Sequence, residues 1–145
     1  MYCKFRDFIL PGFAIFLVGF FMLPAQADTP TPLIAMGDQQ WAKGQLDLAQ
    51  KSFEQAVQAE PLSVNANMKL AGLQLSRQDF KASIPTYQHT IGLDANNAKA
   101  WLGLGFSYLH TGQNNLSLAA FNEAIRIDPG NKEKLAAILA KIGKP

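Results

Sequence analysis

Apolar residues recur along most of the chain at steps of three and four positions. Leu46, Ala49 and Phe53 begin one such series, and Ala56 and Val57 continue it. This spacing places the apolar side chains on one face of an α-helix. No stretch alternates apolar and polar residues between turn signals, so we expect no strands. The pattern predicts seven helices, over residues 31–43, 46–59, 64–77, 80–93, 98–111, 114–127 and 131–142.

Residues that start or stop helices support these bounds. Thr31 is placed to cap the first helix, with Pro32 at the first helical position, where its missing N–H does no harm. Gly44 and Gly112 fall at turns inside two helical pairs, where a left-handed residue ends a helix. Asp79 is placed to cap the helix that follows it. Several of the expected helices thus have residues near their ends that favour starting or stopping a helix.

The chain also repeats itself every 34 residues. Small, aromatic and helix-stopping positions recur in turn: Gly37, Ala71 and Gly105; Phe53, Tyr87 and Phe121; Pro61, Ala95 and Pro129. A period of this length is typical of stacked supersecondary units, in which each pair of helices buries its apolar face on its neighbours. We therefore expect three units within 33–131, with the periods 30–63, 64–97 and 98–131, and a capping helix in 132–145.

The residues at these positions resemble the tetratricopeptide repeat family. The third unit matches the family pattern of large, small and aromatic residues most fully, with Trp101, Leu104, Gly105, Tyr108, Gly112, Phe121, Ala124 and Pro129. The first unit matches with Met36, Gly37, Gly44, Ala49, Phe53, Ala56 and Pro61. The resemblance covers about residues 31–131. It implies an all-α fold, a short right-handed solenoid of helix-turn-helix units.

The second unit departs most from the family pattern. Asn67, Gln74 and Thr90 stand where larger or smaller apolar residues are expected, and Ala95 stands in place of the proline. Pro85 lies past the first turn of its expected helix, where it removes a hydrogen bond and predicts a kink. Two interpretations stay open, tolerated drift of the sequence or a bend that reshapes a binding surface.

Residues 1–27 resemble a secretory signal rather than part of the folded domain. Lys4 and Arg6 precede an uncharged apolar run over residues 8–23, and small residues flank position 26. This anatomy predicts cleavage after residue 27, followed by a short linker over 28–32. The apolar run is shorter than the span of about 20 residues that crosses a bilayer. We expect an exported protein, periplasmic or secreted, and keep a retained membrane anchor as the alternative.

Composition argues against most catalytic and nucleic-acid chemistry. The formal net charge of the chain is only +2, and no basic stripe is visible, so we expect no nucleic-acid partner. His89 and His110 lack a second histidine at ligand spacing, and Cys3 is the single cysteine. We therefore expect no metal and no cofactor. Neither a nucleophile elbow nor a phosphate-binding glycine loop is present, so we predict that the chain is not an enzyme.

The family resemblance implies that the first helix of each pair lines a concave groove. Carried over position by position, it assigns this groove the residues Ile34, Asp38, Trp41, Asn65, Met68, Leu75, Lys99, Leu102, Phe106, Leu109 and His110. One branch of the family holds a carboxylate in this groove with Lys and Asn, but Ile34 and Asp38 replace that pair here. The set is mostly apolar, which favours a peptide or helix as the ligand. For Leu75 and Leu109, core packing and ligand contact both stay open, whereas Trp101 and Tyr108 are interpreted as core.

Two functions remain open for a chain with this sequence. The first is a protein–protein interaction module that holds an apolar or amphipathic segment of a partner in the groove, as a scaffold or assembly factor. The second is a self-associating repeat protein, in which another copy fills the same groove. In either case the membrane would be met only through an uncleaved amino-terminal segment.

Overall fold

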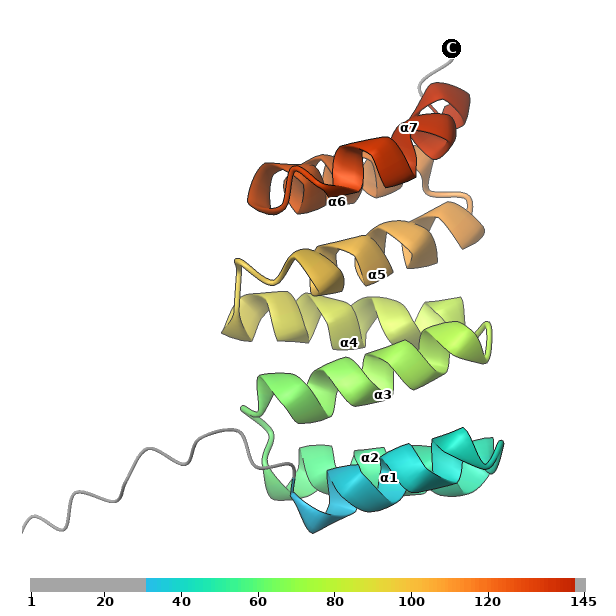
Figure 1. Cartoon of the computed structure of the whole chain (residues 1–145), viewed down its shortest axis with the longest axis vertical. Coiled ribbons are helices and arrows are strands. Elements are labelled where there is room, and N and C mark those ends of the chain that lie inside the picture. The colour runs from blue at the N-terminus through green and yellow to red at the C-terminus, as the bar shows by residue number, and fades with distance from the viewer. Residues whose placement is uncertain (1–30, 143–145) are drawn as a thin grey trace, which may run out of the picture.

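A computed structural model describes residues 31–142 of the chain. Seven helices follow one another as antiparallel neighbours in a single stack (Figure 1): α1 (Pro32–Ala42), α2 (Leu46–Ala59), α3 (Val64–Ser76), α4 (Phe80–Leu93), α5 (Ala98–His110), α6 (Asn114–Ile127) and α7 (Asn131–Ile142). Each helix packs on the next, and α3 also contacts α5. No strand occurs among the described residues. The expected all-α helical solenoid of seven helices is confirmed.

Side-chain caps fix where several helices begin. The Thr31 hydroxyl accepts the backbone N–H of Ile34 at 3.4 Å, and the Asp79 carboxylate accepts that of Ala82 at 3.3 Å. Both caps were expected from the sequence. Ser63 and Asn97 cap α3 and α5 in the same way, with an acceptor oxygen three residues before the N–H that it binds. A cap of this kind contributes about 1 kcal/mol to helix stability.

The turn inside each pair contains one residue in the left-handed region. Gly44 has φ +73° and Gly112 has φ +76°, as their positions predicted. The second unit reaches the same conformation without glycine, because Gln78 has φ +63° and stands 34 residues from both glycines. The turn geometry is therefore repeated three times, and in one unit a residue with a side chain is forced into it.

Small residues on the first helix of a pair make room for an aromatic ring on the second. A Cβ added to Gly37 would overlap the ring of Phe53, and one added to Gly105 would overlap the ring of Phe121. Both rings are fully buried. The Ser117 hydroxyl donates to the Gly105 carbonyl at 2.8 Å across the same contact. The recurrence of small residues every 34 positions therefore reflects close helix packing.

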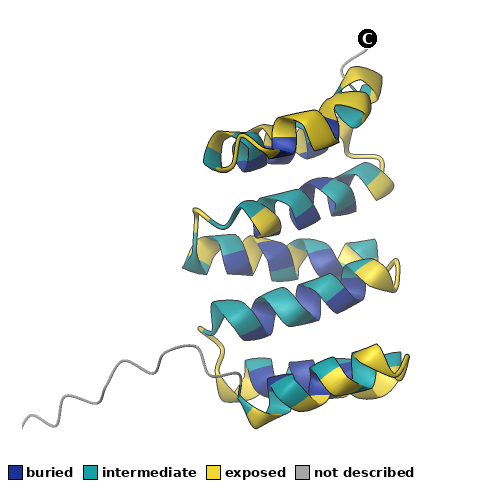
Figure 2. Cartoon of the chain, viewed as in Figure 1, coloured by how far each residue is buried: buried dark blue, intermediate teal, exposed yellow. Residues whose placement is uncertain are grey.

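Buried apolar side chains form two clusters along the stack. The first joins units one and two, with Ile34, Ala49, Phe53, Ala56, Ala66, Leu70 and Leu73. The second joins units two and three, with Ala71, Tyr87, Ala100, Leu104, Tyr108 and Ala120. Trp101 packs against the second cluster while its indole N–H donates to the Ala95 carbonyl at 2.9 Å. The interpretation of Tyr108 as a core residue is thus confirmed, whereas Trp101 is only partly buried at the edge of the cluster. Figure 2 shows buried positions recurring along each helix between exposed turns.

Polar bonds account for the irregular residues of the second unit. The buried Asn67 amide donates to the carbonyls of Pro61 and Ser63, at 3.0 and 2.9 Å, and so ties the turn between α2 and α3 to the core. Gln74 accepts the hydroxyl of Thr86 at 2.9 Å. Pro85 lies inside α4, which runs from Phe80 to Leu93 without interruption. The expected kink therefore does not end the helix, and a bend at Pro85 stays a prediction.

The last helix closes the stack as expected. Leu135 is buried, and the side-chain amide of Asn131 donates to the Ala124 carbonyl at 3.3 Å from a buried position. The remaining apolar residues of α7, Ile138, Leu139 and Ile142, are only partly covered. One face of α7 thus packs on α6 while its lysines stay in solvent.

The predicted signal over 1–27 lies outside the described residues. Within residues 31–142, no helix has the length and apolar character needed to cross a bilayer.

Candidate peptide-binding groove

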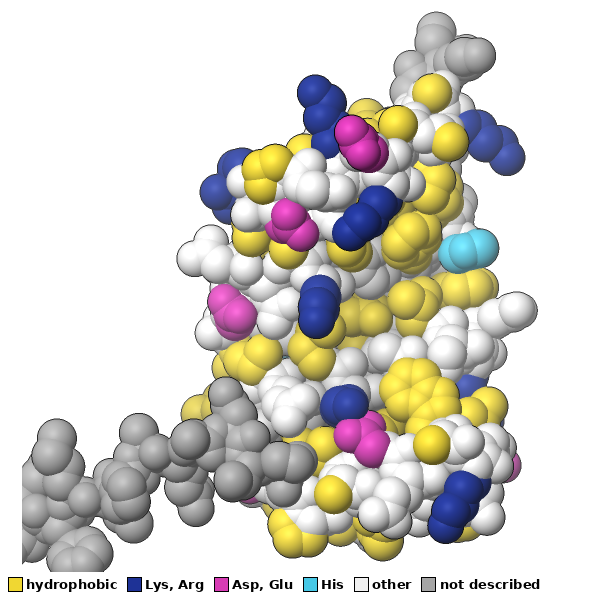
Figure 3. All heavy atoms as spheres, in the orientation of Figure 1, with side chains coloured by type: hydrophobic (Ala, Val, Ile, Leu, Met, Phe, Trp, Pro, Cys, Tyr) yellow, Lys and Arg dark blue, Asp and Glu magenta, His cyan; other side chains and the backbone are white. Residues whose placement is uncertain are grey.

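The helices α1, α3 and α5 present one continuous face of the stack. Figure 3 views this face and shows hydrophobic side chains gathered across its middle, with positive and negative side chains beside one another lower down. Each of these helices is the first of its pair, so equivalent positions of the repeat lie on the same face of the stack. The predicted groove residues all belong to these three helices.

A cleft of about 710 Å³ opens between the beginnings of α3 and α5. It is lined by Val64, Asn65, Met68, Lys69, Asp94, Asn97 and Lys99. The structure thus brings together three of the predicted site residues, Asn65, Met68 and Lys99. The cleft combines apolar surface from Val64 and Met68 with two ammonium groups, those of Lys69 and Lys99, and one carboxylate, that of Asp94.

The predicted residues of α5 continue this surface. Leu102, Phe106 and Leu109 are each partly exposed. The Phe106 ring meets the buried Phe121 ring edge to face, with centroids 5.1 Å apart. One side of the Phe106 ring therefore contacts the core, and the rest of the ring is exposed on the groove face.

Two predicted groove residues of α3 also serve the core. Met68 and Leu75 are partly buried and pack against the second apolar cluster. For Leu75 the structure favours core packing, the first of the two interpretations left open. Met68 combines both environments, because it also lines the cleft.

Trp41 lies where α1 meets α3. Its indole ring is edge-on to the Phe53 ring, with centroids 6.2 Å apart, and it packs against the first cluster. A Cβ added to Gly72 of α3 would lie 3.7 Å from the tip of the indole, so the absence of a side chain at Gly72 gives the ring its place. Trp41 therefore stabilises the contact between α1 and α3 and is only partly available to a ligand.

The assignment of Ile34 to the groove is wrong. Ile34 is only 2% exposed and belongs to the first core cluster, with Leu70 and Leu73 of α3. The reason is packing, because the side chain lies among buried residues of α2 and α3 and a partner could not reach it. Met68 and Leu102, at the same repeat position, stay partly exposed.

His110 lies apart from the cleft. It is exposed at the end of α5, and its ring stacks on Phe80 at a centroid distance of 4.3 Å and an interplanar angle of 7°. Together with Gln78, Asp79, Lys81 and Thr111 these two residues line a separate hollow of about 320 Å³ beside the turns. His110 therefore marks the edge of the face rather than its floor.

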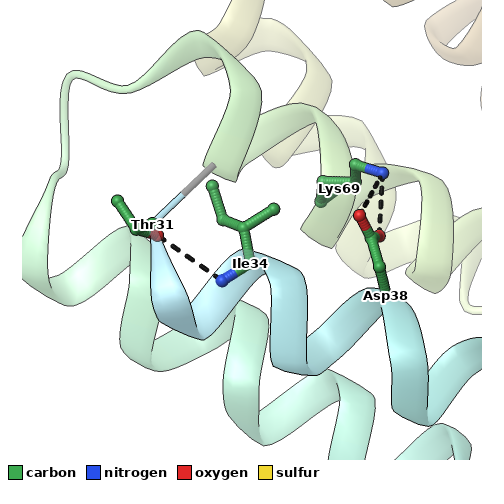
Figure 4. A network of polar contacts seen from close by, with 4 residues as sticks. All are labelled: Thr31, Ile34, Asp38 and Lys69. Atoms are coloured by element: carbon green, nitrogen blue, oxygen red, sulfur yellow. Dashed lines mark hydrogen bonds and ion pairs between the residues drawn. The ribbon is translucent and has the colours of Figure 1, made fainter. Parts of the chain in front are cut away.

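An ion pair crosses the groove from α1 to α3. Both carboxylate oxygens of Asp38 accept from Lys69 Nζ, at 2.7 and 2.8 Å (Figure 4). Lys69 was not among the predicted site residues. A signal for it existed, because α1 and α3 are parallel neighbours one repeat apart, so opposite charges about one repeat apart can meet across them.

Sequence reasoning also missed a hollow on the other side of α5. It measures about 270 Å³ and is lined by Gln88, Ile91, Trp101, Leu104, Tyr108, Leu116, Ala119 and Ala120. The Gln88 amide donates to the Tyr108 hydroxyl at 2.8 Å in its wall. This hollow opens where α4 and α6 leave the back of α5 uncovered, a property of helix spacing that no local pattern indicates.

A clear departure from ordinary values occurs at Tyr87, where burial raises the pKa of the phenol to about 12. Tyr87 is a core residue on α4 and does not line the cleft. Among the described residues, no group of three His, Cys, Asp or Glu side chains could hold a metal ion. The face offers shape, apolar area and a few charges to a ligand.

Comparisons with known proteins identify the same repeat. Two family models described as tetratricopeptide repeat (TPR) match residues 34–97 and 74–142. The curated protein CTR9 homolog of Arabidopsis thaliana is 27% identical over 110 residues, which cover 75% of this chain and 10% of that protein. The chain thus spans about a tenth of the length of this relative.

Solved structures share the fold. The first TPR of Spaghetti (RPAP3), bound to the HSP90 peptide SRMEEVD, superposes with a TM-score of 0.72 at 17% identity, over 77% of this chain and 87% of that one. The second TPR domain of human RPAP3, in complex with the HSP70 peptide SGPTIEEVD, has a TM-score of 0.70 at 20% identity, over 78% and 97%. Both structures are complexes of a TPR domain with a peptide. Together with the repeat matches and the helical stack, they lead to one conclusion: this chain belongs to the tetratricopeptide repeat family.

Proposed function

We propose that this chain is a non-enzymatic interaction module that holds an apolar or amphipathic segment of a partner protein on the face of α1, α3 and α5. The observation that carries the proposal is the cleft between α3 and α5 with the partly exposed apolar side chains beside it, Met68, Leu102 and Phe106. An apolar surface with few polar groups gains free energy mainly by being covered. The fold neighbours that carry peptides support this use of the face.

The apolar and polar parts of the face would contact different groups of a ligand. Met68 and Leu102 stand 34 residues apart, on α3 and α5, so one ligand side chain can contact both. Asn65 and Lys99 border the same cleft and offer an amide and an ammonium to ligand oxygens. An amphipathic helix, or an extended segment with alternate apolar residues, meets both requirements.

Peptide selection tests the proposal without requiring an identified partner. A phage library of random peptides is selected on the purified protein, and the affinities of the selected peptides are then measured by calorimetry. We expect apolar residues at helical or alternating spacing among the selected peptides. Changing Met68 and Leu102 together to Gln should weaken their binding by about tenfold or more, since each truncation of apolar contact costs about 1 kcal/mol.

Leu116→Gln is the matched control for these substitutions. Leu116 is 48% exposed and lines the hollow behind α5, so the same change of residue type leaves the groove intact. Circular dichroism must show equal helicity for all variants. If the selected peptides bind the Met68 and Leu102 variant as tightly as the parent protein, the groove is not their site and the proposal fails.

Self-association is the second proposed function, with a copy of the chain as the occupant of the face. The most exposed large apolar side chains, Met36, Leu48, Leu62 and Leu116, give it little support, because Leu48, Leu62 and Leu116 lie outside the three helices of the groove. Single exposed leucines are ordinary on protein surfaces. Sedimentation over a range of concentrations separates the two functions, since a concentration-independent monomer excludes the second.

Export is a further part of the proposal and rests on residues 1–27 alone. Their charged, apolar and small-residue segments are those of a secretory signal. The mass of the protein isolated from its host tests this directly. A mature form beginning at residue 28 supports export, whereas a mass that includes residues 1–27 favours a retained membrane anchor.

A further inference from the structure

The ion pair between Asp38 and Lys69 is a feature of one unit and not of the repeat. One repeat later the Asp38 position is Gly72, and two repeats later it is Phe106. One repeat after Lys69 the position is Gly103, and one repeat before it is Ala35. The helices α3 and α5 contact each other without any such pair. Stacking of the first helices of neighbouring units therefore does not require the ion pair between Asp38 and Lys69.

The pair also changes the charge that the groove shows to a ligand. The cleft between α3 and α5 is bordered by two ammonium groups, those of Lys69 and Lys99. Both oxygens of Asp38 are directed at Lys69 Nζ, as Figure 4 shows, and the two side chains remain 40% and 35% exposed. Within residues 31–142, Lys99 makes no ion pair. The carboxylate of Asp94 borders the same cleft, so with Lys69 paired to Asp38 the remaining charges are one ammonium, Lys99, and one carboxylate, Asp94.

We propose that Asp38 is a specificity-determining residue of the groove, a built-in counter-ion that occupies Lys69 and excludes partner carboxylates from the α1–α3 end. The occupant selected there is an apolar, uncharged stretch from the interior of a partner chain. This inference rests on the proposed function, because it concerns what the same face selects. Charge complementarity carries it, since a neutral pair beside apolar side chains matches a neutral segment.

An incoming carboxylate meets two obstacles at this end of the groove. It competes for Lys69 with a carboxylate of the same molecule, whose effective concentration is high because the fold holds Asp38 Oδ1 2.7 Å from Lys69 Nζ. It also approaches the negative charge of Asp38, which repels it. Because the pair is partly exposed, each effect is modest, and together they correspond to about fivefold in affinity.

Asp38→Asn removes the negative charge and keeps the shape of the side chain. The test compares two synthetic peptides by calorimetry: a leucine-containing peptide that ends in Glu-Glu with a free carboxyl terminus, and the same peptide with Gln-Gln and an amidated end. The parent protein should bind the acidic peptide no more tightly than the neutral one. In Asp38→Asn the acidic peptide should gain about fivefold, and the gain should shrink at high salt.

Two further variants show whether Lys69 is responsible. In the double variant Asp38→Asn, Lys69→Gln the gain should disappear. Asp47→Asn changes the net charge by the same amount and breaks the pair with Arg77, formed at 2.6 Å between α2 and the end of α3, outside the cleft. It should leave both affinities unchanged, so a gain there would reveal a mere effect of net charge.

The outcomes separate this inference from the proposed function. The inference is overturned if the neutral peptide binds all variants equally and Asp38→Asn does not raise the affinity for the acidic peptide. The groove assignment then stands. Preferential binding of the acidic peptide by the parent protein also overturns it. If neither peptide binds any variant, and library selection on the same face fails as well, the proposed function falls and the inference falls with it.

Discussion

The left-handed residue in the turn between α3 and α4 should limit the stability of the domain. Gln78 adopts φ +63° at the position held by Gly44 and Gly112 in the other units. A residue with a Cβ loses about 1–2 kcal/mol in this conformation. Replacing it with glycine also loosens the unfolded chain, which costs about 0.4–1 kcal/mol. Gln78→Gly should therefore raise the free energy of unfolding by a net amount of about 0.5–1 kcal/mol.

Three other glycine positions make the test specific to backbone conformation. A Cβ added to Gly44, Gly92 or Gly112 would meet nothing within 4 Å, so steric overlap plays no part at any of them. Gly44→Ala and Gly112→Ala should each destabilise the domain by about 1 kcal/mol, because φ is positive at both. Gly92→Ala should instead stabilise it by about 0.5 kcal/mol, because Gly92 is an ordinary helical residue of α4.

Urea unfolding followed by circular dichroism measures these changes, with the urea dependence of the free energy checked for equality between variants. A change of 1 kcal/mol corresponds to roughly 4 °C in Tm for a domain of this size. The decisive comparison is Gln78→Gly against Gly44→Ala. If both substitutions leave stability unchanged, or if Gln78→Gly destabilises, then the positive φ of Gln78 is not a source of strain and the reasoning is refuted.

Two further predictions concern the contact between α4 and α5. Gly103→Ala should destabilise the domain by about 1–3 kcal/mol, because its Cβ would overlap the Tyr87 ring; wild-type stability in urea would contradict the packing. Burial raises the pKa of Tyr87 from 10.0 to about 12, so the native state holds this proton more tightly than the unfolded chain does. The contribution of the protonated Tyr87 to the free energy of unfolding is fully present below pH 10 and is lost as the pH rises from 10 towards 12. Unfolding free energies measured across this range should fall less steeply in Tyr87→Phe, and identical slopes would contradict burial of the phenol.

Much of the fold follows from local chemistry and was predicted from the sequence. Helical periodicity places the seven helices, and Thr31, Asp79, Gly44 and Gly112 mark their ends through bonds and dihedral angles that depend on nearby residues. The 34-residue recurrence of small residues opposite aromatic ones predicts helical pairs, because a ring such as Phe53 fits only where Gly37 lacks a side chain.

The candidate site was predicted less completely, because a position in the repeat does not determine which neighbouring residues cover a side chain. Asn65, Met68 and Lys99 do border one cleft. His110, however, stacks on Phe80 outside it, and Trp41 packs over Gly72 between two helices. Each of these differences depends on the neighbour that lies across a helix–helix contact, and the sequence of one unit does not contain that neighbour.

The sequence by itself determined the repeat, its helices and the family, since these depend on periodicity and on short-range caps and turns. The tertiary structure alone decided that Ile34 is core while Met68 and Leu102 remain accessible, and that Asp38 meets Lys69 across the groove. The physical reason is the stacking of units. Equivalent positions share a helix face, but the side chains that each position meets on the neighbouring helices decide which are buried, paired or left to a partner.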